Sequence, residues 1–281
     1  MGDDAHEGEE ERRSDPHTLE GIVSEKYRKG VEDAGKCVYT LARECRENLK
    51  TNGVVALHGF LDETVVKELV TEAEEIMPDA FYTNSRHNVY LTPQSEEFAT
   101  DHVHNVQLSS SKGCVQDDQI GRNSKLRLLY SNKAFRSFVA HVVNEKFLYE
   151  YADPLSSINI HYASAGQELN YHFDNSSFAI TLLLQKPEGG GLFQYIKDVR
   201  DADNGEMNYA MVQKVLDGEV EPTTLTMLPG TLVLFRGRNS IHRVTPTLGN
   251  TTRILCVLAF NNRPGVALSE SARMTFFGRL K

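Results

Sequence analysis

A histidine and an aspartate two positions apart, His172 and Asp174, are the residues whose types and spacing first suggest chemistry. Side chains two positions apart in an extended segment project from one face of the strand, so both can reach one ion. A third ligand from another strand, for which His242 is the candidate, would complete a 2-His-1-carboxylate set. Such a set binds Fe(II) on one face and leaves the opposite positions open. A His-x-Asp pair alone arises by chance, so the surrounding sequence must support this interpretation.

The basic residue Arg253 adds a second chemical element. It follows His242 by eleven residues, after the turn-forming residues 247–250, and so falls on the next predicted strand. If hairpin pairing brings it close to the metal, its guanidinium can bind a carboxylate through two parallel hydrogen bonds, which a lysine would not match. This placement suggests a dicarboxylate cosubstrate.

The composition is that of a protein with a full core and an acidic surface. The 281 residues are 40% hydrophobic and 25% charged, with a formal net charge of −9, which fits one large domain or a domain with extensions. The negative charge argues against a basic surface for nucleic acid. No apolar run approaches the roughly 20 residues that cross a bilayer, the N-terminus does not resemble a signal peptide, and the four cysteines show no Cys-x-x-Cys spacing. We expect a cytoplasmic protein that binds neither nucleic acid nor membranes, with monomer and homo-oligomer both open.

The first half of the chain predicts helices that support a site elsewhere. Residues 1–17 are acidic and lack large apolar residues after the first, which predicts a disordered tail. Residues 18–281 then form a single domain, in which 18–150 supply helical support and substrate loops. Apolar spacing predicts two helices within 18–49, a strand at 53–60, a helix from the cap residue Asp62 to Met77, and a helix over 133–146. Residues 79–131 show no sustained period and are expected to form lids or binding loops.

The second half predicts a β-rich core. Eight short alternating or β-branched runs follow one another at 157–162, 169–174, 178–185, 191–196, 223–228, 231–237, 240–246 and 252–261. Eight strands in about one hundred residues indicate a closed or two-sheet antiparallel architecture. We therefore expect a mainly β protein with flanking helices (α+β), with a jelly-roll core over 155–262 and an N-terminal helical extension. The acidic insert 198–222, with helical spacing near its middle, is expected to cap one end of the barrel.

Four strings within this core carry a resemblance to a known family. HFD, GGGLFQY, PGTLVLFRGRNSIHRVTP and TTRI resemble the Fe(II)/2-oxoglutarate-dependent oxygenases of the double-stranded β-helix superfamily, of the prolyl-hydroxylase-like kind. The resemblance implies His172, Asp174 and His242 as iron ligands and catalytic residues, and Arg253 as the group that binds the far carboxylate of 2-oxoglutarate. It implies Fe(II), 2-oxoglutarate and O2 as cofactors, with ascorbate as a supporting reductant.

The longer strings LLLQKPEGGGLFQY and LPGTLVLFRGRNSIHRVTP are similar to a narrower branch that includes halogenases and hydroxylases of free amino acids. In those halogenases a small residue replaces the carboxylate ligand, so that chloride can occupy the vacated iron position. Asp174 fills that position in this chain. The resemblance therefore favours hydroxylation, desaturation or oxidative cyclisation of a small-molecule substrate, a free amino acid or amino-acid-derived metabolite, over halogenation.

Two other functions stay open. A protein side-chain hydroxylase of the prolyl type is the first, because an acidic surface favours basic peptides, although no repeat or peptide-binding module is evident. The second is a non-catalytic jelly-roll binding protein. The intact ligand set together with Arg253 argues against that alternative.

Several polar residues beside the ligand set are further candidates. Asn159, His161, Tyr162 and Thr245 are expected either to orient the imidazoles or bind the cosubstrate, or to point outward from their strands. For cosubstrate binding we select Asn159, Tyr162 and Thr245 beside Arg253.

The irregular region contributes candidates for the pocket entrance. Its aromatic and basic side chains Arg86, His87, Tyr90, His102 and His104 are expected to line that entrance. His102 and His104 have the spacing of a metal-binding pair, but no third ligand follows them nearby. A metal role for this pair is therefore disfavoured.

Overall fold

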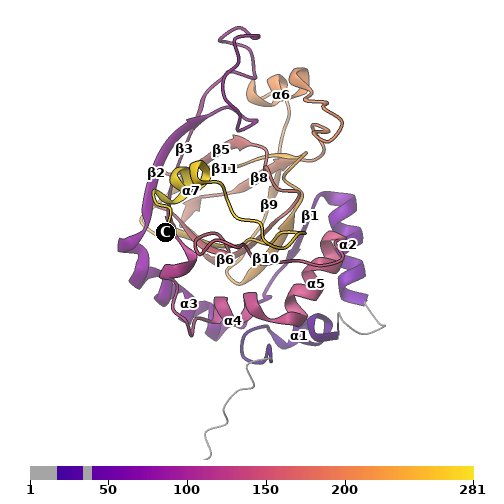
Figure 1. Cartoon of the computed structure of the whole chain (residues 1–281), viewed down its shortest axis with the longest axis vertical. Coiled ribbons are helices and arrows are strands. Elements are labelled where there is room, and N and C mark those ends of the chain that lie inside the picture. Colours follow the sequence, from indigo (N-terminus) through magenta and orange to yellow (C-terminus); the bar gives the residue numbers. More distant parts are fainter. Residues whose placement is uncertain (1–17, 34–39) are drawn as a thin grey trace, which may run out of the picture.

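The two larger sheets are both antiparallel (Figure 1). This computed structural model describes residues 18–33 and 40–281, so the predicted tail at 1–17 lies outside the described residues. The seven-stranded major sheet has the order β1 (Val54–Leu57), β10 (Thr231–Phe235), β6 (Ala179–Gln185), β13 (Arg253–Leu258), β4 (Ile158–Ala163), β3 (Leu108–Val115), β2 (Phe81–His87). The four-stranded minor sheet has the order β5 (Leu169–His172), β11 (Ile241–Val244), β8 (Phe193–Ile196), β9 (Thr223–Leu225). A short pair, β7 (Gly189–Gly190) and β12 (Thr247–Leu248), completes the strands.

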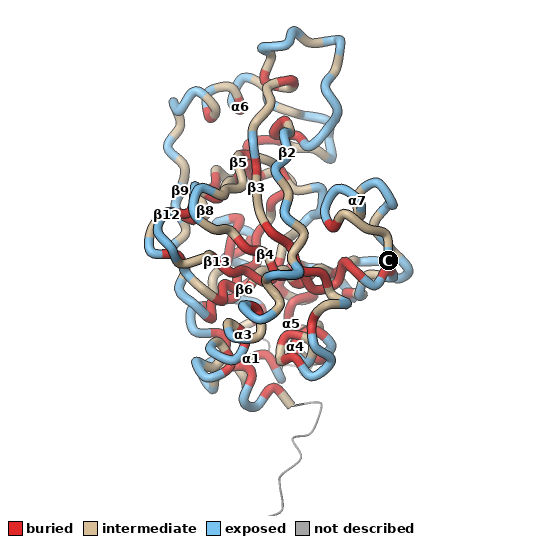
Figure 2. Tube along the Cα trace, turned by 90° about the vertical axis from the view of Figure 1, so that its left-hand side faces the viewer, coloured by how far each residue is buried: buried red, intermediate tan, exposed pale blue. Residues whose placement is uncertain are grey.

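Helices cover the outer face of the major sheet (Figures 1 and 2). These are α1 (Glu25–Glu32), α2 (Thr40–Asn52), α3 (Glu63–Ile76), α4 (Lys125–Ser131) and α5 (Lys133–Val143), with short 3-10 turns at Met77–Asp79 and Asp117–Gln119. The predicted cap Asp62 accepts from the Thr64 amide through its carboxylate, and α5 likewise begins at Asn132, whose side chain accepts from the Ala134 and Phe135 amides. Of the remaining helices, α6 (Tyr209–Leu216) lies in the acidic insert and α7 (Glu270–Phe277) near the C-terminus. None of the described helices has the length and apolar character needed to cross a membrane.

The two faces of the major sheet have opposite chemistry. On β4, Ile158, Ile160 and Tyr162 are fully buried in the large core shared with the helices. The alternate residue His161 therefore faces the space between the sheets. The same alternation on β13 sends Ile254, Cys256 and Leu258 into the helical core and leaves Arg253 on the inner face. An apolar outer face thus anchors the sheet while polar side chains collect inside the barrel.

The β-rich prediction is confirmed, and one region differs from expectation. Each of the eight predicted runs contains a strand, and the helices predicted over 18–49, 62–77 and 133–146 are present. Residues 79–131 are not wholly irregular, because β2 and β3 pair along their whole length, β3 joins β4 in the major sheet, and α4 follows. β2 was hard to predict because its side chains are mostly exposed and polar. Its strand conformation follows from pairing with β3 rather than from apolar alternation.

Candidate active site

His172, Asp174 and His242 converge at one end of the barrel interior. His172 ends β5 and is the register partner of His242 on β11, so the two rings lie side by side with centroids 4.2 Å apart. Nε2 of His242 and Nε2 of His172 lie 3.5 and 3.9 Å from Asp174 Oδ1. One ligand atom from each of the three lies within 4.8 Å of the others. The structure therefore brings together the three residues that sequence spacing selected.

Backbone carbonyls hold both imidazoles in the orientation that metal binding needs. His172 Nδ1 lies 2.8 Å from the Asn170 carbonyl oxygen, and His242 Nδ1 lies 3.0 Å from the Ser240 carbonyl oxygen. A carbonyl can only accept, so each Nδ1 carries the proton and each Nε2 keeps its lone pair. Both lone pairs face the Asp174 carboxylate. This arrangement is the one by which protein carbonyls orient metal-bound histidines.

The charges of the three groups fit a divalent cation. Burial, reinforced by the neighbouring His242, lowers the pKa of His172 and keeps its ring neutral. Burial alone would raise the pKa of Asp174, but His242, His172 and Lys112 outweigh it and lower that pKa. Asp174 Oδ2 is buried and has no hydrogen-bond partner among the described residues. Two imidazoles and an ionised carboxylate with an unpaired oxygen are the donor set expected for Fe(II).

Gly237 makes room for the carboxylate. Asp174 follows the end of β5, and its amide donates to the Gly237 carbonyl at 3.0 Å. A Cβ built at Gly237 would overlap the Asp174 carboxylate. Glycine at 237 is therefore required by the close approach of the ligand segment rather than by its backbone angle.

Arg253 lies inside the barrel without an anionic partner. Its exposed fraction is 5%, and its guanidinium makes no hydrogen bond or ion pair with any residue in 18–33 or 40–281. Burial lowers its pKa to about 10, which still leaves it charged at neutral pH. Buried charges are normally paired. Arg253 therefore offers an unmatched cation to an anionic ligand, as its predicted role requires.

A lysine that sequence reasoning did not select lies on the same inner face. Lys112, on β3, approaches both ring nitrogens of His161, with Nζ 3.2 Å from Nδ1 and 3.1 Å from Nε2. Burial lowers the pKa of Lys112, and burial together with Lys112 and Arg253 lowers that of His161 well below its usual range. The segment around Lys112 reads as a polar loop, so only strand pairing reveals which way its side chain points.

The other three predicted cosubstrate residues are placed differently. Tyr162 is on the outer face of β4, where its hydroxyl donates to the Ala73 carbonyl at 2.6 Å in the helical core. Asn159 is on the inner face, but its amide donates to the Leu155 and Ile158 carbonyls. Thr245 Oγ1 accepts from the Leu192 amide at 3.0 Å. None of these side-chain bonds reaches the ligand set. Tyr162 is excluded from it by strand alternation, which makes it point opposite to His161.

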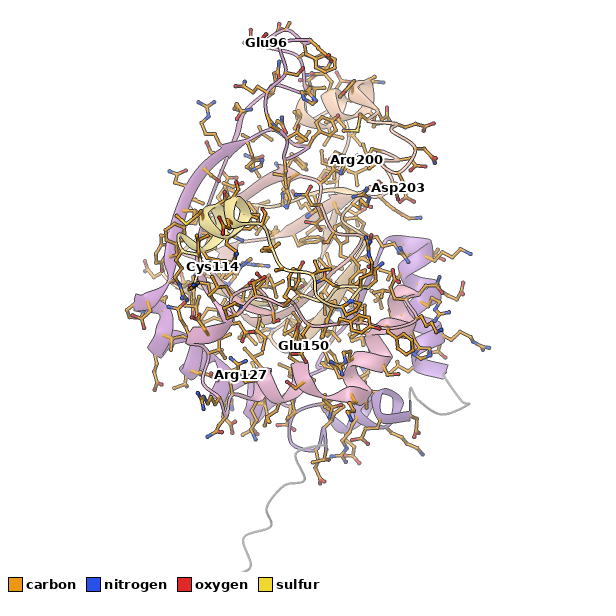
Figure 3. All side chains as sticks on the ribbon, in the orientation of Figure 1. Glu96, Cys114, Arg127, Glu150, Arg200 and Asp203 are labelled. Atoms are coloured by element: carbon orange, nitrogen blue, oxygen red, sulfur yellow. The ribbon has the colours of Figure 1, made fainter. Side chains whose placement is uncertain are left out.

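The mouth of the barrel is covered by two segments that pack through aromatic rings. The connection from β2 to β3, with Glu96 near its tip, approaches α6 in Figures 1 and 3. Tyr209 at the start of α6 contacts the rings of Tyr90, Phe98, His102 and His104 at centroid distances of 4.9 to 6.1 Å. We call these five residues the aromatic cluster. The insert thus packs at one end of the barrel, as predicted.

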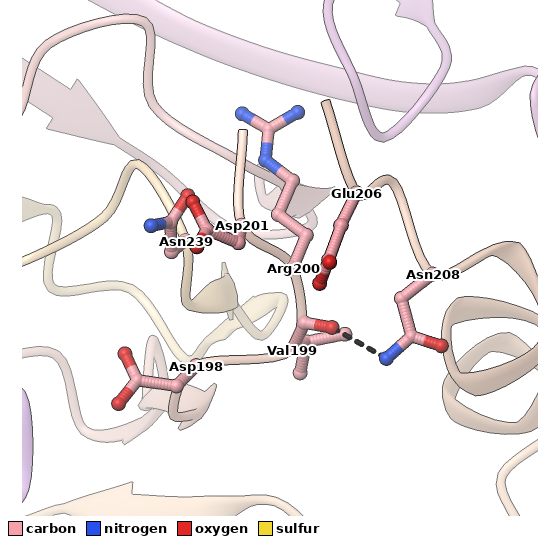
Figure 4. A pocket seen from close by; sticks show the side chains of 7 residues that line it. All are labelled: Asp198, Val199, Arg200, Asp201, Glu206, Asn208 and Asn239. Atoms are coloured by element: carbon pink, nitrogen blue, oxygen red, sulfur yellow. Dashed lines mark hydrogen bonds between the residues drawn. The ribbon is translucent and has the colours of Figure 1, made fainter. Parts of the chain in front are cut away.

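A cavity of about 560 Å³ is formed mostly by the acidic insert. It is lined by Asp198, Val199, Arg200, Asp201, Glu206, Asn208 and Asn239 (Figure 4). The Arg200 guanidinium lies 4.1 Å from the ring centroid of Phe173, the residue between His172 and Asp174. Its Nε donates to the Arg238 carbonyl at 2.8 Å. Arg200 gave no sequence signal, because it lies among acidic residues of the insert.

One protein-family model and several solved structures resemble this chain. The family model described as Halogenase D matches residues 39–274. No curated protein matches the sequence. Among solved structures, the non-heme α-ketoglutarate-dependent carbocyclase SnoK from nogalamycin biosynthesis is 12% identical, with a TM-score of 0.57, and the match covers 83% of this chain and 91% of SnoK.

Two prolyl hydroxylases share the same fold. A Pseudomonas putida prolyl-4-hydroxylase is 12% identical with a TM-score of 0.51, covering 79% of this chain and 100% of that one. A Trichoplax adhaerens prolyl hydroxylase, solved with a hypoxia-inducible-factor peptide, is 13% identical with a TM-score of 0.52, covering 82% and 96%. At these identities the likeness is one of fold, and it confirms the predicted jelly-roll architecture.

Proposed function

The chain belongs to the Halogenase D family within the Fe(II)/2-oxoglutarate oxygenases, and from that premise we propose that it oxidises an unactivated C–H bond of a small molecule. The substrate class we propose is a free amino acid or an amino-acid-derived metabolite. The outcome is hydroxylation, desaturation or oxidative cyclisation, with 2-oxoglutarate converted to succinate.

Each residue of the site has a distinct role in this proposal. His172, Asp174 and His242 would hold Fe(II), and the Asn170 and Ser240 carbonyls would keep the two imidazoles oriented. The buried Arg253 binds the far carboxylate of 2-oxoglutarate. When bound, the iron, 2-oxoglutarate and O2 together supply the oxidant that removes hydrogen from a substrate C–H bond. The surrounding chain has to orient the substrate and keep bulk water away.

The observation that carries the proposal is the carboxylate of Asp174 between the two imidazoles. The family model is described as a halogenase. The branch that the sequence resembles contains halogenases in which a small residue replaces the carboxylate ligand. Here Asp174 is present, ionised, and accommodated by Gly237. Its place is the one that a halide would need. We therefore propose a non-halogenating oxidation for this member of the family.

The charged cavity at the acidic insert has the chemistry to hold a small zwitterionic molecule. Arg200 supplies a cation, and Asp198, Asp201 and Glu206 supply carboxylates around the same space. An amino acid carries both signs of charge within a few bonds, so one end can pair with Arg200 while its ammonium pairs with a carboxylate. A volume of about 560 Å³ is in the range of small-molecule pockets, roughly 300 to 1,000 Å³.

A substrate screen that follows succinate release tests the proposal. Free amino acids are supplied with Fe(II), 2-oxoglutarate and O2, with and without chloride, and the product mass is measured. We expect a gain of one oxygen or a loss of two hydrogens, independent of chloride. A chlorinated product would contradict the assignment to Asp174. Turnover with peptides alone would favour a protein side-chain hydroxylase, and unchanged iron binding in His172→Ala would favour a non-catalytic protein.

A further inference from the structure

The interior face of the major sheet carries more positive charge than the iron ligands can balance. Lys112 on β3 and Arg253 on β13 both point into the barrel, on either side of β4. Burial lowers the pKa of Lys112, and the Cys114 thiol and the Asp174 carboxylate oppose that shift, but Asp174 makes no ion pair with Lys112 within the described part of the chain. A buried cation without an ion-pair partner is costly unless a ligand supplies the anion.

The strand register places the two cations around a small residue. Arg253 is the register partner of Ala163, and Gly113, the neighbour of Lys112, is the partner of Tyr162. Lys112 and Arg253 therefore flank β4 near Ala163, on strands that lie two spacings, or about 10 Å, apart. Ala163, the residue between them on β4, contributes only a methyl group to this face.

The two cations differ in their distance from the iron ligands. Ser110, two residues before Lys112 on the same face, accepts from the Asn170 amide at 2.9 Å, which joins β3 to the strand that carries His172. Ser110 Oγ also lies 2.7 Å from Nε2 of His87, whose ring meets that of His172 edge-on. Lys112 therefore lies toward the metal end of the interior, whereas Arg253 lies on the far side of β4.

From this geometry we infer that Lys112 binds the keto-acid end of 2-oxoglutarate while Arg253 binds its far carboxylate. The inference rests on the proposed function, because it assigns the second end of the cosubstrate in that same site. His161 is a positioning residue, since its Nε2 lies 3.1 Å from Lys112 Nζ. Lys112 and His161 both keep partial exposure inside the barrel, as groups lining a ligand space do.

Two keto acids separate the roles of the two cations. 2-Oxoglutarate carries both carboxylates, whereas 2-oxobutyrate carries only the keto-acid end. The dissociation constant of each is measured with the full chain and Fe(II) without oxygen, by titration calorimetry. Lys112→Met should weaken both keto acids by about 10- to 100-fold, the usual value of a lost hydrogen bond to a charged group. Arg253→Met should weaken 2-oxoglutarate alone, and Lys112→Arg should recover most of the loss.

A matched lysine and a second variant keep the test decisive. Lys67→Met, on the exposed face of α3, should change neither constant. If Lys112→Met does not fold, Lys112→Gln is measured instead, because glutamine keeps a donor for His161 without the charge. His161→Phe should lower the affinity for both keto acids by a smaller factor than Lys112→Met.

The outcomes distinguish this inference from the function on which it rests. Wild-type protein that binds no 2-oxoglutarate would overturn the proposed function itself. Wild-type protein that binds both keto acids, with Lys112→Met binding them within about twofold of wild type, would overturn only the role of Lys112. Loss of iron affinity without loss of keto-acid affinity would do the same, because it would show that Lys112 serves Asp174 alone.

Discussion

Histidines gather at two places in this molecule, and their surroundings differ. His172 and His242 lie at the end of the barrel with both Nε2 atoms facing Asp174 and both Nδ1 atoms facing backbone carbonyls. His102 and His104 lie in the aromatic cluster, stacked on Phe98 and Tyr90 respectively. Sequence spacing alone therefore does not show that a pair of histidines binds a metal. A nearby carboxylate, together with backbone acceptors that fix the Nδ1 atoms, is the stronger indication.

The aromatic cluster uses its histidines as flat rings. His102 Nδ1 accepts from the His104 amide at 3.2 Å, so it stabilises the local turn. His104 Nδ1 is buried and has no partner among the described residues. Neither ring is joined to a carboxylate in the described ion pairs or metal-ligand groups. The same residue type therefore forms part of a candidate metal site in one region and packs between the β2–β3 connection and α6 in the other.

Replacing a candidate iron ligand should have the largest effect on iron affinity. His172→Ala removes one of three donors, so we expect iron affinity to fall by more than about 100-fold, beyond the effect typical of outer partners. Anaerobic titration with Fe(II), with circular dichroism to verify folding, measures this. Retention of wild-type iron affinity in a folded variant would mean that the ion is held elsewhere.

Removing the space beside Asp174 should give the next largest effect. Gly237→Ala forces the Asp174 carboxylate to move, because the added Cβ would overlap it. We expect iron affinity to fall by about 10- to 100-fold, as for the loss of a group that orients a ligand. Gly121→Ala is the matched control, since a Cβ there meets only ordinary contact with Glu72. Equal iron affinity in the two alanine variants would count against the seating of Asp174.

Changing the shape of the buried cation should have a smaller effect, confined to the cosubstrate. Arg253→Lys keeps the charge but loses the planar fork that grips a carboxylate. We expect 2-oxoglutarate to bind about tenfold more weakly, in line with one lost charge-assisted hydrogen bond, while iron affinity stays unchanged. Calorimetric titration of each ligand separates the two. A loss of iron affinity instead would place Arg253 with the metal ligands.

Substitution in the aromatic cluster should have the smallest effect. His104→Phe keeps a ring for stacking on Tyr90 and removes a buried nitrogen without a partner. We expect iron affinity to stay within about twofold of wild type and stability to change by about 1 kcal/mol or less, as for shape-conserving core substitutions. Thermal unfolding and Fe(II) titration measure both. A large loss of iron would show that the two histidine groups are not separate.

The ligand set could be predicted from the sequence because its signals are local. The pair His172 and Asp174 lies on an alternating run, and His242 lies on another, so a two-sheet architecture was enough to bring them together. The placement of Asp174 adds a detail that alternation does not contain, because it follows β5 and is positioned by the Gly237 carbonyl.

The other residues on the inner face of the major sheet were harder to predict, for two physical reasons. Lys112 lies on an edge hairpin whose polar residues have no apolar alternation, and its direction depends on pairing with β4. Tyr162 was assigned to the cosubstrate although Ile158 and Ile160 share its face, and an apolar face packs on the core. Side chains alternate between the two faces of a strand, so in the run 157–162 His161 lies on the inner face and Tyr162 on the outer face.

The most direct test of the site is the anaerobic visible spectrum of the iron-loaded protein on addition of 2-oxoglutarate. A keto acid chelated to Fe(II) gives a visible charge-transfer band. We expect that band in the wild type and in His104→Phe, and its absence in His172→Ala. Folded, iron-loaded wild-type protein that shows no band at saturating 2-oxoglutarate would contradict the assignment of His172, Asp174 and His242 to an iron and 2-oxoglutarate site.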